Sequence, residues 1–345
     1  MIYLDNAAGA FPKAPGAAEA LSAAATGLAP NIGRGGYALA YDTAARVMDI
    51  RCRLASFFGV GDPRRVIFTP GCTWSLNMAL RGILNPEDSV HLVGPPHNAV
   101  ARPLHALQTF ESETAPITIA THGSNVSGEV FSIPRTGGTV IVDAAQTAGV
   151  LSIDFDTCGA DAMAIACHKG LMAPAGIGLL LLSERMAERL SPVITGGTGS
   201  FSDSPKMPPV LPDRFEPGTP NLPGILGLGA ALDFVTERWA DIQAKKAEQV
   251  AAVRTLFSDI PGVRLVKLPD LPVWSLDFLR HDNAEAAFRL EAEYGIITRC
   301  GLHCAPAAHR MLGTYPQGTV RFSAGYFTAM EEIEQTAQAV REVAI

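Results

Sequence analysis

The stretch MAIACHKGLMAPAGIGLLLLS (Met163–Ser183) sets two apolar runs on either side of a His–Lys pair. Both runs are short, apolar and bounded by turn residues, which predicts two buried strands over 161–167 and 176–183. His168 and Lys169 directly follow the first of them. A lysine that enters a dry pocket between apolar strands is costly unless it is paired, depressed in pKa or covalently engaged. A surface lysine with only its stem buried is the ordinary alternative.

Similar strands alternate with helical stretches through the first two-thirds of the chain. Further strands are predicted in RRVIFTP, SVHLVGPP, ITIA and TVIVDAA, and helices in TWSLNMALRGIL (73–84) and AVARPLHALQTF (99–110). This rhythm predicts an α/β domain with a mainly parallel sheet that is covered on both faces.

The pattern changes at 195–221, a stretch rich in Gly, Pro and Ser. A linker is one interpretation, but so long a loop in a compact protein is more often functional. Residues 222–257 then predict two helices, and the remainder predicts a small α+β domain. We therefore expect a large α/β domain over 14–225, and a smaller domain formed by 1–13 together with 226–345.

Composition narrows the class of protein. The 345 residues are 48% hydrophobic and 18% charged, which favours a compact globular chain. A net charge of -7 without a basic run argues against nucleic-acid or anionic-membrane partners. No targeting signal is evident, and the longest apolar run is too short to span a bilayer. Six cysteines in a chain of this length indicate free thiols and a cytoplasmic protein.

Polar residues follow several of the predicted strands, where ligands bind in sheets of this kind. Cys72 and Thr73 stand between a strand and a helix, so that N–H groups and a hydroxyl could hold a phosphate, although a simple helix cap fits equally. Asp143 ends a buried strand and Gln146 follows it, while His97 follows another strand. With the His–Lys pair, this set matches what pyridoxal phosphate needs: a lysine, an acid and an anion cradle.

These motifs resemble a known family. The chain is similar to the fold-type I pyridoxal-phosphate enzymes of the class V aminotransferase type, and within them to the short-loop branch of the cysteine desulfurase and selenocysteine lyase family. The resemblance covers essentially the whole chain, through YLDNAAGAFP, NIGRGGYALA, VIFTPGCTWSLNMAL, PPHNAVARPL, SNVSGE, VDAAQTAG, ACHKGLMAPAGIG, FEPGTPN, TRCGLHCAPAAH and GTVRFSAGYF. It implies a large domain with a mainly parallel seven-stranded sheet and a smaller α+β C-terminal domain.

The resemblance also implies roles for matching residues around the cofactor ring. Lys169 matches the lysine that bonds covalently to pyridoxal phosphate, and Asp143 the acid at the pyridine nitrogen. Gln146 matches the amide at the phenolic oxygen, and Asn125 a polar residue near that oxygen and the substrate. His97 matches the histidine that stacks on the ring and assists proton transfer.

Other matches concern the phosphate and the substrate. Cys72, Thr73 and His168 fall at phosphate positions, and Thr219 matches a threonine that reaches the phosphate of a neighbouring subunit. A homodimer with shared active sites follows from that match. Arg321 matches the arginine that binds the substrate carboxylate as a fork. Substrate contacts are expected from Asn31, Arg299, His303 and Arg321.

The stretch TRCGLHCAPAAHR (Thr298–Arg310) resembles the nucleophile loop of the desulfurases, with Cys304 at the position of the cysteine. Positive charge from Arg299 and His303 would favour its thiolate, which is the nucleophilic form. The expected reaction converts L-cysteine to L-alanine and leaves a persulfide on Cys304, for transfer to a protein acceptor. The alternatives with the same cofactor are an aminotransferase, an epimerase and a β-eliminating lyase, including selenocysteine lyase.

Two other interpretations of this stretch also involve Cys300. A zinc site could draw on Cys300, Cys304, His303 and His309, but the spacing fits no tight pattern, and we expect no metal. A disulfide or a sulfur relay between Cys300 and Cys304 is a further alternative. The sequence also departs from the family at Ala166, where a serine is common, at Tyr37, where a histidine is common, and at Cys300.

Overall fold

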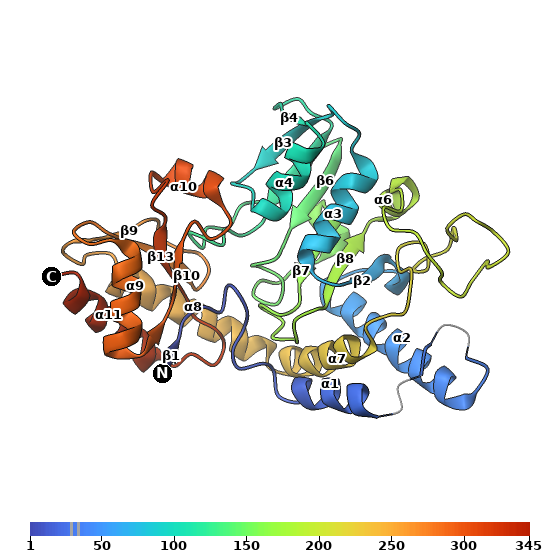
Figure 1. The fold of residues 1–345 in the computed structure, drawn as a ribbon, viewed down its shortest axis with the longest axis horizontal. Helices are drawn as coiled ribbons and strands as arrows, with labels where there is room; N and C mark the ends of the chain where they lie inside the picture. The colour runs from blue at the N-terminus through green and yellow to red at the C-terminus, as the bar shows by residue number, and fades with distance from the viewer. Residues whose placement is uncertain (28–29, 33–34) are drawn as a thin grey trace.

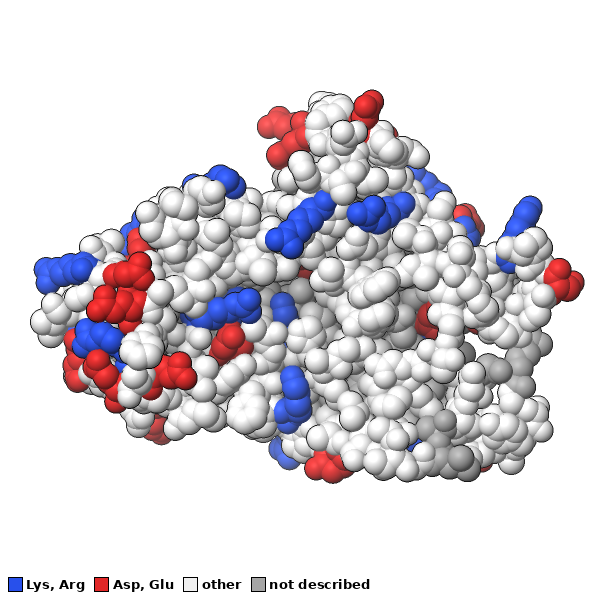
Figure 2. Space-filling view, viewed as in Figure 1, with Lys and Arg blue, Asp and Glu red and all other residues white. Residues whose placement is uncertain are grey.

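The computed structural model describes residues 1–27, 30–32 and 35–345 and divides into two units, one large and one small (Figure 1). Residues 33–34 of the stretch NIGRGGYALA lie outside the described residues. Charged side chains of both signs gather over the small unit, whereas the visible face of the large unit is mostly uncharged (Figure 2).

A seven-stranded sheet forms the centre of the large unit, in the order β2-β8-β7-β6-β5-β3-β4. Its strands are β2 (Val66–Thr69), β3 (Ser89–Val93), β4 (Phe110–Glu111), β5 (Ile117–Thr121), β6 (Thr139–Asp143), β7 (Ala162–Ala166) and β8 (Gly178–Leu182). All neighbours are parallel except β8, which is antiparallel to both β2 and β7. The prediction of a mainly parallel sheet is confirmed, and the carboxyl ends of β2, β7, β6, β5 and β3 share one edge.

One strand differs from the prediction. Residues 99–110 were expected to be helical throughout, but α4 (Asn98–Ala106) ends earlier and Phe110 begins β4. This strand is two residues long and exposed, and it pairs with Ser89 and Val90 of β3. A pair of exposed residues carries no periodicity, so its strand conformation depends on a partner far away in the sequence.

Helices cover both faces of the large sheet. One face carries α3 (Cys72–Ile83), α4 and α6 (Glu184–Arg189); the other carries α1 (Ala17–Thr26), α2 (Ala38–Phe58), α5 (Phe155–Cys158) and α7 (Leu222–Glu237), with a 3-10 turn at Pro63–Arg65. The central strands β6, β7 and β8 are buried at every position because both of their faces are covered. The stretch 195–221, all of which the structure describes, forms no helix or strand.

The small unit has an antiparallel sheet with helices packed against it. The sheet order is β12 (Arg299–Gly301), β13 (Thr319–Ser323), β10 (Val273–Phe278) and β9 (Val263–Leu265), and the helices are α8 (Trp239–Leu256), α9 (Asn283–Tyr294), α10 (Pro306–Leu312) and α11 (Met330–Val343). A separate parallel pair joins β1 (Ile2–Tyr3) to β11 (Ile296–Ile297). The predicted pair of helices over 222–257 is confirmed as α7 and α8.

The expected domain boundary between residues 225 and 226 falls inside α7. Leu228 and Leu232, which follow it, belong to the same apolar core as Ile225. Val253, near the end of α8, belongs to the core of the small unit. The division into domains stays a prediction, and these cores favour placing the change within α8. In the described part of the chain, no helix is both long enough and apolar enough to cross a membrane.

Candidate active site

A cavity with about 1100 Å³ of empty volume lies where the carboxyl edge of the large sheet faces the small unit. The predicted site residues that line it are Cys72, Thr73, His97, Asn125, Asp143, Gln146, His168, Lys169, Arg299, His303, Cys304 and Arg321. They come from segments far apart in the sequence, and the sheet topology brings them together. Ligands bind at this edge in open α/β sheets.

Lys169 lies in the turn after β7, is half-buried and lines the cavity. Burial lowers the pKa of its ammonium, while the nearby Cys72 and Asp143 partly oppose that shift. A lowered pKa increases the neutral fraction of the amine, which is the form that acts as a nucleophile or base. Its place in the cavity disfavours the interpretation of Lys169 as an ordinary surface lysine.

Asp143 ends β6 and is almost fully buried. Its Oδ1 accepts a hydrogen bond from the Ala145 N–H at 3.0 Å and lies 3.8 Å from the Cys72 sulfur. Burial, followed by the charge of Asp143, raises the pKa of the Cys72 thiol well above its usual value. Cys72 is therefore a protonated donor to Asp143, and the carboxylate can still stabilise a cation in the cavity.

The cavity also receives the N-terminal end of α3. No side chain in the described part of the chain caps this helix, and Gly71, Cys72 and Thr73 all line the cavity. The first N–H groups of a helix have no partner within it and favour an anion. An anion cradle, a buried acid and a lysine with a lowered pKa at one site fit pyridoxal phosphate.

Several further polar groups border the same cavity. His97 caps α4, and its Nδ1 accepts from the Ala99 N–H at 3.0 Å; burial lowers its pKa, so that the ring is neutral with its proton on Nε2. Gln146 donates from Nε2 to the Ala7 carbonyl at 3.1 Å. Burial lowers the pKa of His168 to about 4. His168 therefore contributes no positive charge at neutral pH.

On the small unit, the pairing of β12 with β13 decides which side chains face the cavity. Arg299 lies opposite Arg321, and Cys300 lies opposite Val320. Because successive side chains of a strand point to opposite faces, the two arginines share the cavity face and Cys300 shares the other face with a core residue. This explains why Arg299 and Arg321 line the cavity whereas Cys300 does not.

Cys304 lies in a strained turn that the large unit holds. His303 and Cys304 have positive φ values of 48° and 57°, which are uncommon for residues other than glycine. The Asn98 N–H donates to the Cys304 carbonyl at 2.7 Å, and Asn125 Nδ2 donates to the His303 carbonyl at 2.7 Å. Cys304 itself is exposed. The turn thus presents an accessible thiol at the mouth of the cavity.

The expected positive charge of His303 is wrong. Its ring is buried, and its Nε2 lies 3.2 Å from the Thr319 carbonyl and 3.1 Å from the Thr319 hydroxyl. Burial and the nearby Arg321 lower the pKa of His303 to about 2, so that the ring is neutral. His303 shapes the turn, and Arg299 lines the same cavity as Cys304. Its effect on the Cys304 thiol stays a prediction.

Asn31 and Thr219 are exposed and are not among the described residues that line the cavity. Asn31 stands between α1 and α2, which cover the face of the sheet opposite α3. A substrate contact from Asn31 within its own chain is therefore not supported. The role expected of Thr219 concerns a neighbouring subunit and stays a prediction.

The zinc and disulfide alternatives gain no support. All six cysteines are free thiols. In the described part of the chain, no group of three His, Cys, Asp or Glu side chains is placed to hold a metal ion. The side chain of Cys300 is turned away from the cavity that Cys304 lines.

Asp5, which pairs with Arg321, was not predicted as a site residue. It lies in YLDNAAGAFP, a stretch that carries the resemblance but was given no site role.

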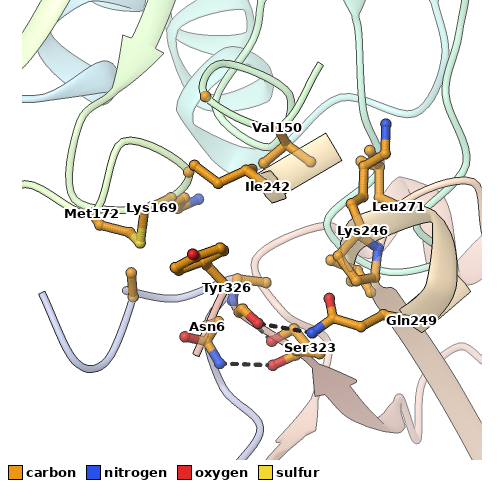
Figure 3. Close-up of a pocket in the computed structure, with 18 of the residues that line it drawn as sticks. Asn6, Val150, Lys169, Met172, Ile242, Lys246, Gln249, Leu271, Ser323 and Tyr326 are labelled. Carbon is orange, nitrogen blue, oxygen red and sulfur yellow. Dashed lines mark hydrogen bonds between the residues drawn. The ribbon is translucent and has the colours of Figure 1, made fainter. Parts of the chain in front are cut away.

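Asn6, the next residue, lines a second cavity of about 720 Å³ (Figure 3). Lys169 lines both cavities. α8 and Tyr326 form further walls of that second cavity (Figure 3).

Fold and site together define a two-unit α/β protein in which a half-buried lysine and an exposed thiol share one cavity. The family model for aminotransferase class-V matches residues 2–117 and 104–336. The chain belongs to this family.

Known relatives span nearly the full length of the chain. A probable cysteine desulfurase of Methanothermobacter thermautotrophicus is 28% identical over 91% of this chain and 88% of the relative. Cysteine desulfurase CsdA of Escherichia coli is 29% identical over 98% of this chain and 93% of the relative. The apo structure of a cysteine desulfurase from Thermococcus onnurineus superposes with a TM-score of 0.88 at 24% identity, covering 99% and 94% of the two chains, which establishes the shared fold.

Proposed function

We propose that the protein is a cysteine desulfurase that uses pyridoxal phosphate to convert L-cysteine to L-alanine. The observation that carries the proposal is one cavity lined by the half-buried Lys169 on one wall and by the exposed Cys304 thiol on the other. The names of the relatives from Methanothermobacter thermautotrophicus and Escherichia coli support the same activity.

The cofactor would be held by residues of the large unit. The N-terminal end of α3 would bind the phosphate, Asp143 would face the ring nitrogen, and Lys169 would bond to the cofactor. When bound, pyridoxal phosphate supplies an electron sink that stabilises negative charge at the substrate Cα. The protonated Cys72 thiol leaves the negative charge of Asp143 available for that role.

The chain's own residues then divide the work. Arg321 binds the substrate carboxylate, and the amine of Lys169 takes the Cα proton. The Cys304 thiolate attacks the substrate sulfur, so that an S–S bond forms while the bond from Cβ to sulfur breaks. The electron pair of the broken bond goes to carbon, which is protonated to give alanine. Cysteine plus the Cys304 thiol thus becomes alanine plus a Cys304 persulfide, with no other reactant.

The partners follow from the same arrangement. The outer sulfur of the exposed Cys304 persulfide would pass to an acceptor protein that reaches the mouth of the cavity. A homodimer in which Thr219 reaches the neighbouring cofactor, and a cytoplasmic location, stay predictions.

The deciding experiment is product analysis with L-cysteine on the wild type and on Cys304→Ser. The wild type should yield alanine and, under reducing conditions, an equal amount of sulfide. Cys304→Ser should lose both while keeping the yellow colour of the bound cofactor. Cys52→Ser, which changes another exposed cysteine on α2, is the matched control and should keep both products.

Each other outcome has a meaning. Sulfide release that persists in Cys304→Ser would overturn the desulfurase in favour of β-elimination, which needs no protein thiol. Transfer of the amino group to a keto acid would favour an aminotransferase. A wild-type protein that stays colourless with added pyridoxal phosphate would exclude all of these activities.

A further inference from the structure

Arg321 is a guanidinium held in an unusually dry place. Its side chain is 2% exposed, and burial lowers its pKa while Asp5 opposes that shift. A buried charge needs a partner, and two groups supply it. Arg321 Nη2 donates to Asp5 Oδ1, and Nη1 donates to the Asn125 carbonyl at 3.2 Å.

The two partners use only part of the guanidinium. Each Nη atom carries two N–H donors, and Asp5 and the Asn125 carbonyl each accept from one of them. Arg321 lines the cavity, whereas Asp5 is not one of the described residues that do so. Asp5 therefore contacts the guanidinium from outside the cavity wall, and the second N–H of each Nη atom is available to a ligand.

The backbone around Asp5 is itself firmly placed. The Asn6 amide Nδ2 donates to the Ser323 carbonyl at 3.0 Å, and the Ala7 N–H donates to the Ser323 hydroxyl at 2.8 Å (Figure 3). The Ser323 N–H donates to the Leu4 carbonyl at 2.7 Å. Because Ser323 is only two residues from Arg321 on β13, these bonds fix the distance between Asp5 and the guanidinium.

The charges on this wall of the cavity also favour one kind of ligand. Arg299 and Arg321 face the cavity together, and Asp5 neutralises one of them. One positive charge remains, which suits a single carboxylate. A planar guanidinium with a fixed orientation binds a carboxylate through two parallel N–H donors.

We propose that Asp5 is a positioning residue that orients Arg321 for the carboxylate of a monocarboxylic amino acid. The inference rests on the proposed function, since it takes the ligand of Arg321 to be the substrate carboxylate. It gives the N-terminal segment a role in substrate binding, in addition to joining β1 to the rest of the small unit.

The test compares Asp5→Ala with Asp5→Asn in the holoenzyme. Asp5→Ala removes both the charge and the acceptor, so the KM for L-cysteine should rise at least about tenfold while kcat changes less than about threefold. Asp5→Asn keeps an acceptor oxygen at the same place and should hold KM within about threefold of the wild type. Glu293→Ala, which breaks an ion pair on the exposed side of α9, is the matched control and should change neither constant.

A second readout does not need turnover. The affinity for L-alanine, measured by calorimetry, should fall about tenfold in Asp5→Ala and stay near the wild-type value in Asp5→Asn. If the wild type binds alanine but never desulfurates cysteine, the proposed function fails while the role of Asp5 can still be measured.

A purely structural role for Asp5 predicts a different pattern. Both Asp5 variants would then lower the melting temperature while KM and the alanine affinity stay at wild-type values. That pattern would overturn the inference and leave the proposed function intact. Equal loss of affinity in Asp5→Asn and Asp5→Ala would overturn it too, because it would show that an acceptor oxygen at this place does not position Arg321.

Discussion

The two walls of the cavity differ in how far their reactive side chains are exposed to solvent. On the large unit, Lys169, Asp143 and Cys72 lie at the ends of rigid elements, and burial shifts the pKa values of Lys169 and Cys72. On the small unit, Cys304 is exposed in a turn. Groups that must be tuned are enclosed, whereas the group that hands over its product must be reached from outside.

The walls also differ in what holds them. The large wall depends on apolar strands packed on both faces, so that strand ends fix its polar groups. The turn at Cys304 depends on a few hydrogen bonds, chiefly from the Asn98 N–H and from Asn125, that cross from the large unit. The small wall can therefore be disturbed locally, while the large wall changes only with the core.

The largest expected effect comes from removing Lys169 from the wall that the large unit forms. Lys169→Ala should lower alanine formation by more than about 10³-fold, because it removes the base and the covalent bond to the cofactor together. Alanine formation is measured by chromatography, with Lys13→Ala as the control, since Lys13 is a partly buried lysine of the N-terminal segment. Alanine formation that survives in Lys169→Ala would assign the base to another residue.

A smaller effect tests whether the buried ring of His303 is neutral in the folded protein. The folded-state pKa of about 2 lies below the unfolded value near 6.5, so below pH 6.5 the unfolded chain binds a proton that the folded chain does not. The contribution is complete above pH 6.5 and is lost as pH falls toward 2, by about 1.4 kcal/mol per pH unit. The free energy of unfolding, measured with urea at pH 5, 6 and 7, should therefore rise less steeply with pH in His303→Gln than in the wild type.

Equal pH dependence of the unfolding free energy in the wild type and His303→Gln would contradict this expectation. It would mean that His303 has the same pKa in the folded and unfolded chains, so that its ring is protonated in the folded protein below about pH 6.5. The charge role that the sequence suggested would then return.

The smallest effect should come from Cys300→Ser. The Cys300 side chain is on the face of β12 turned away from the cavity, and burial raises its pKa. Alanine and sulfide formation should therefore change by less than about twofold. A large loss of sulfide with alanine retained would instead indicate a sulfur relay through Cys300.

The sequence could predict the large wall because each of its groups follows a strand. Asp143, Lys169 and His97 come directly after apolar runs, and parallel strands bring their carboxyl ends to one edge. The small wall was predicted by resemblance alone, and its electrostatics were misjudged at His303. Burial of His303 against Thr319 of β13 and His309 of α10 cannot be read from the letters LHCAP, although it reverses the charge expected there.

The sequence by itself determined the apolar strands, the helices between them and the order of the family motifs, since these depend on residues close together in the chain. The tertiary structure decided which face of β12 meets the cavity, that Asp5 from the N-terminus grips Arg321, and that a left-handed turn presents Cys304. Those outcomes depend on strand register and on contacts between segments hundreds of residues apart, and no local pattern specifies them.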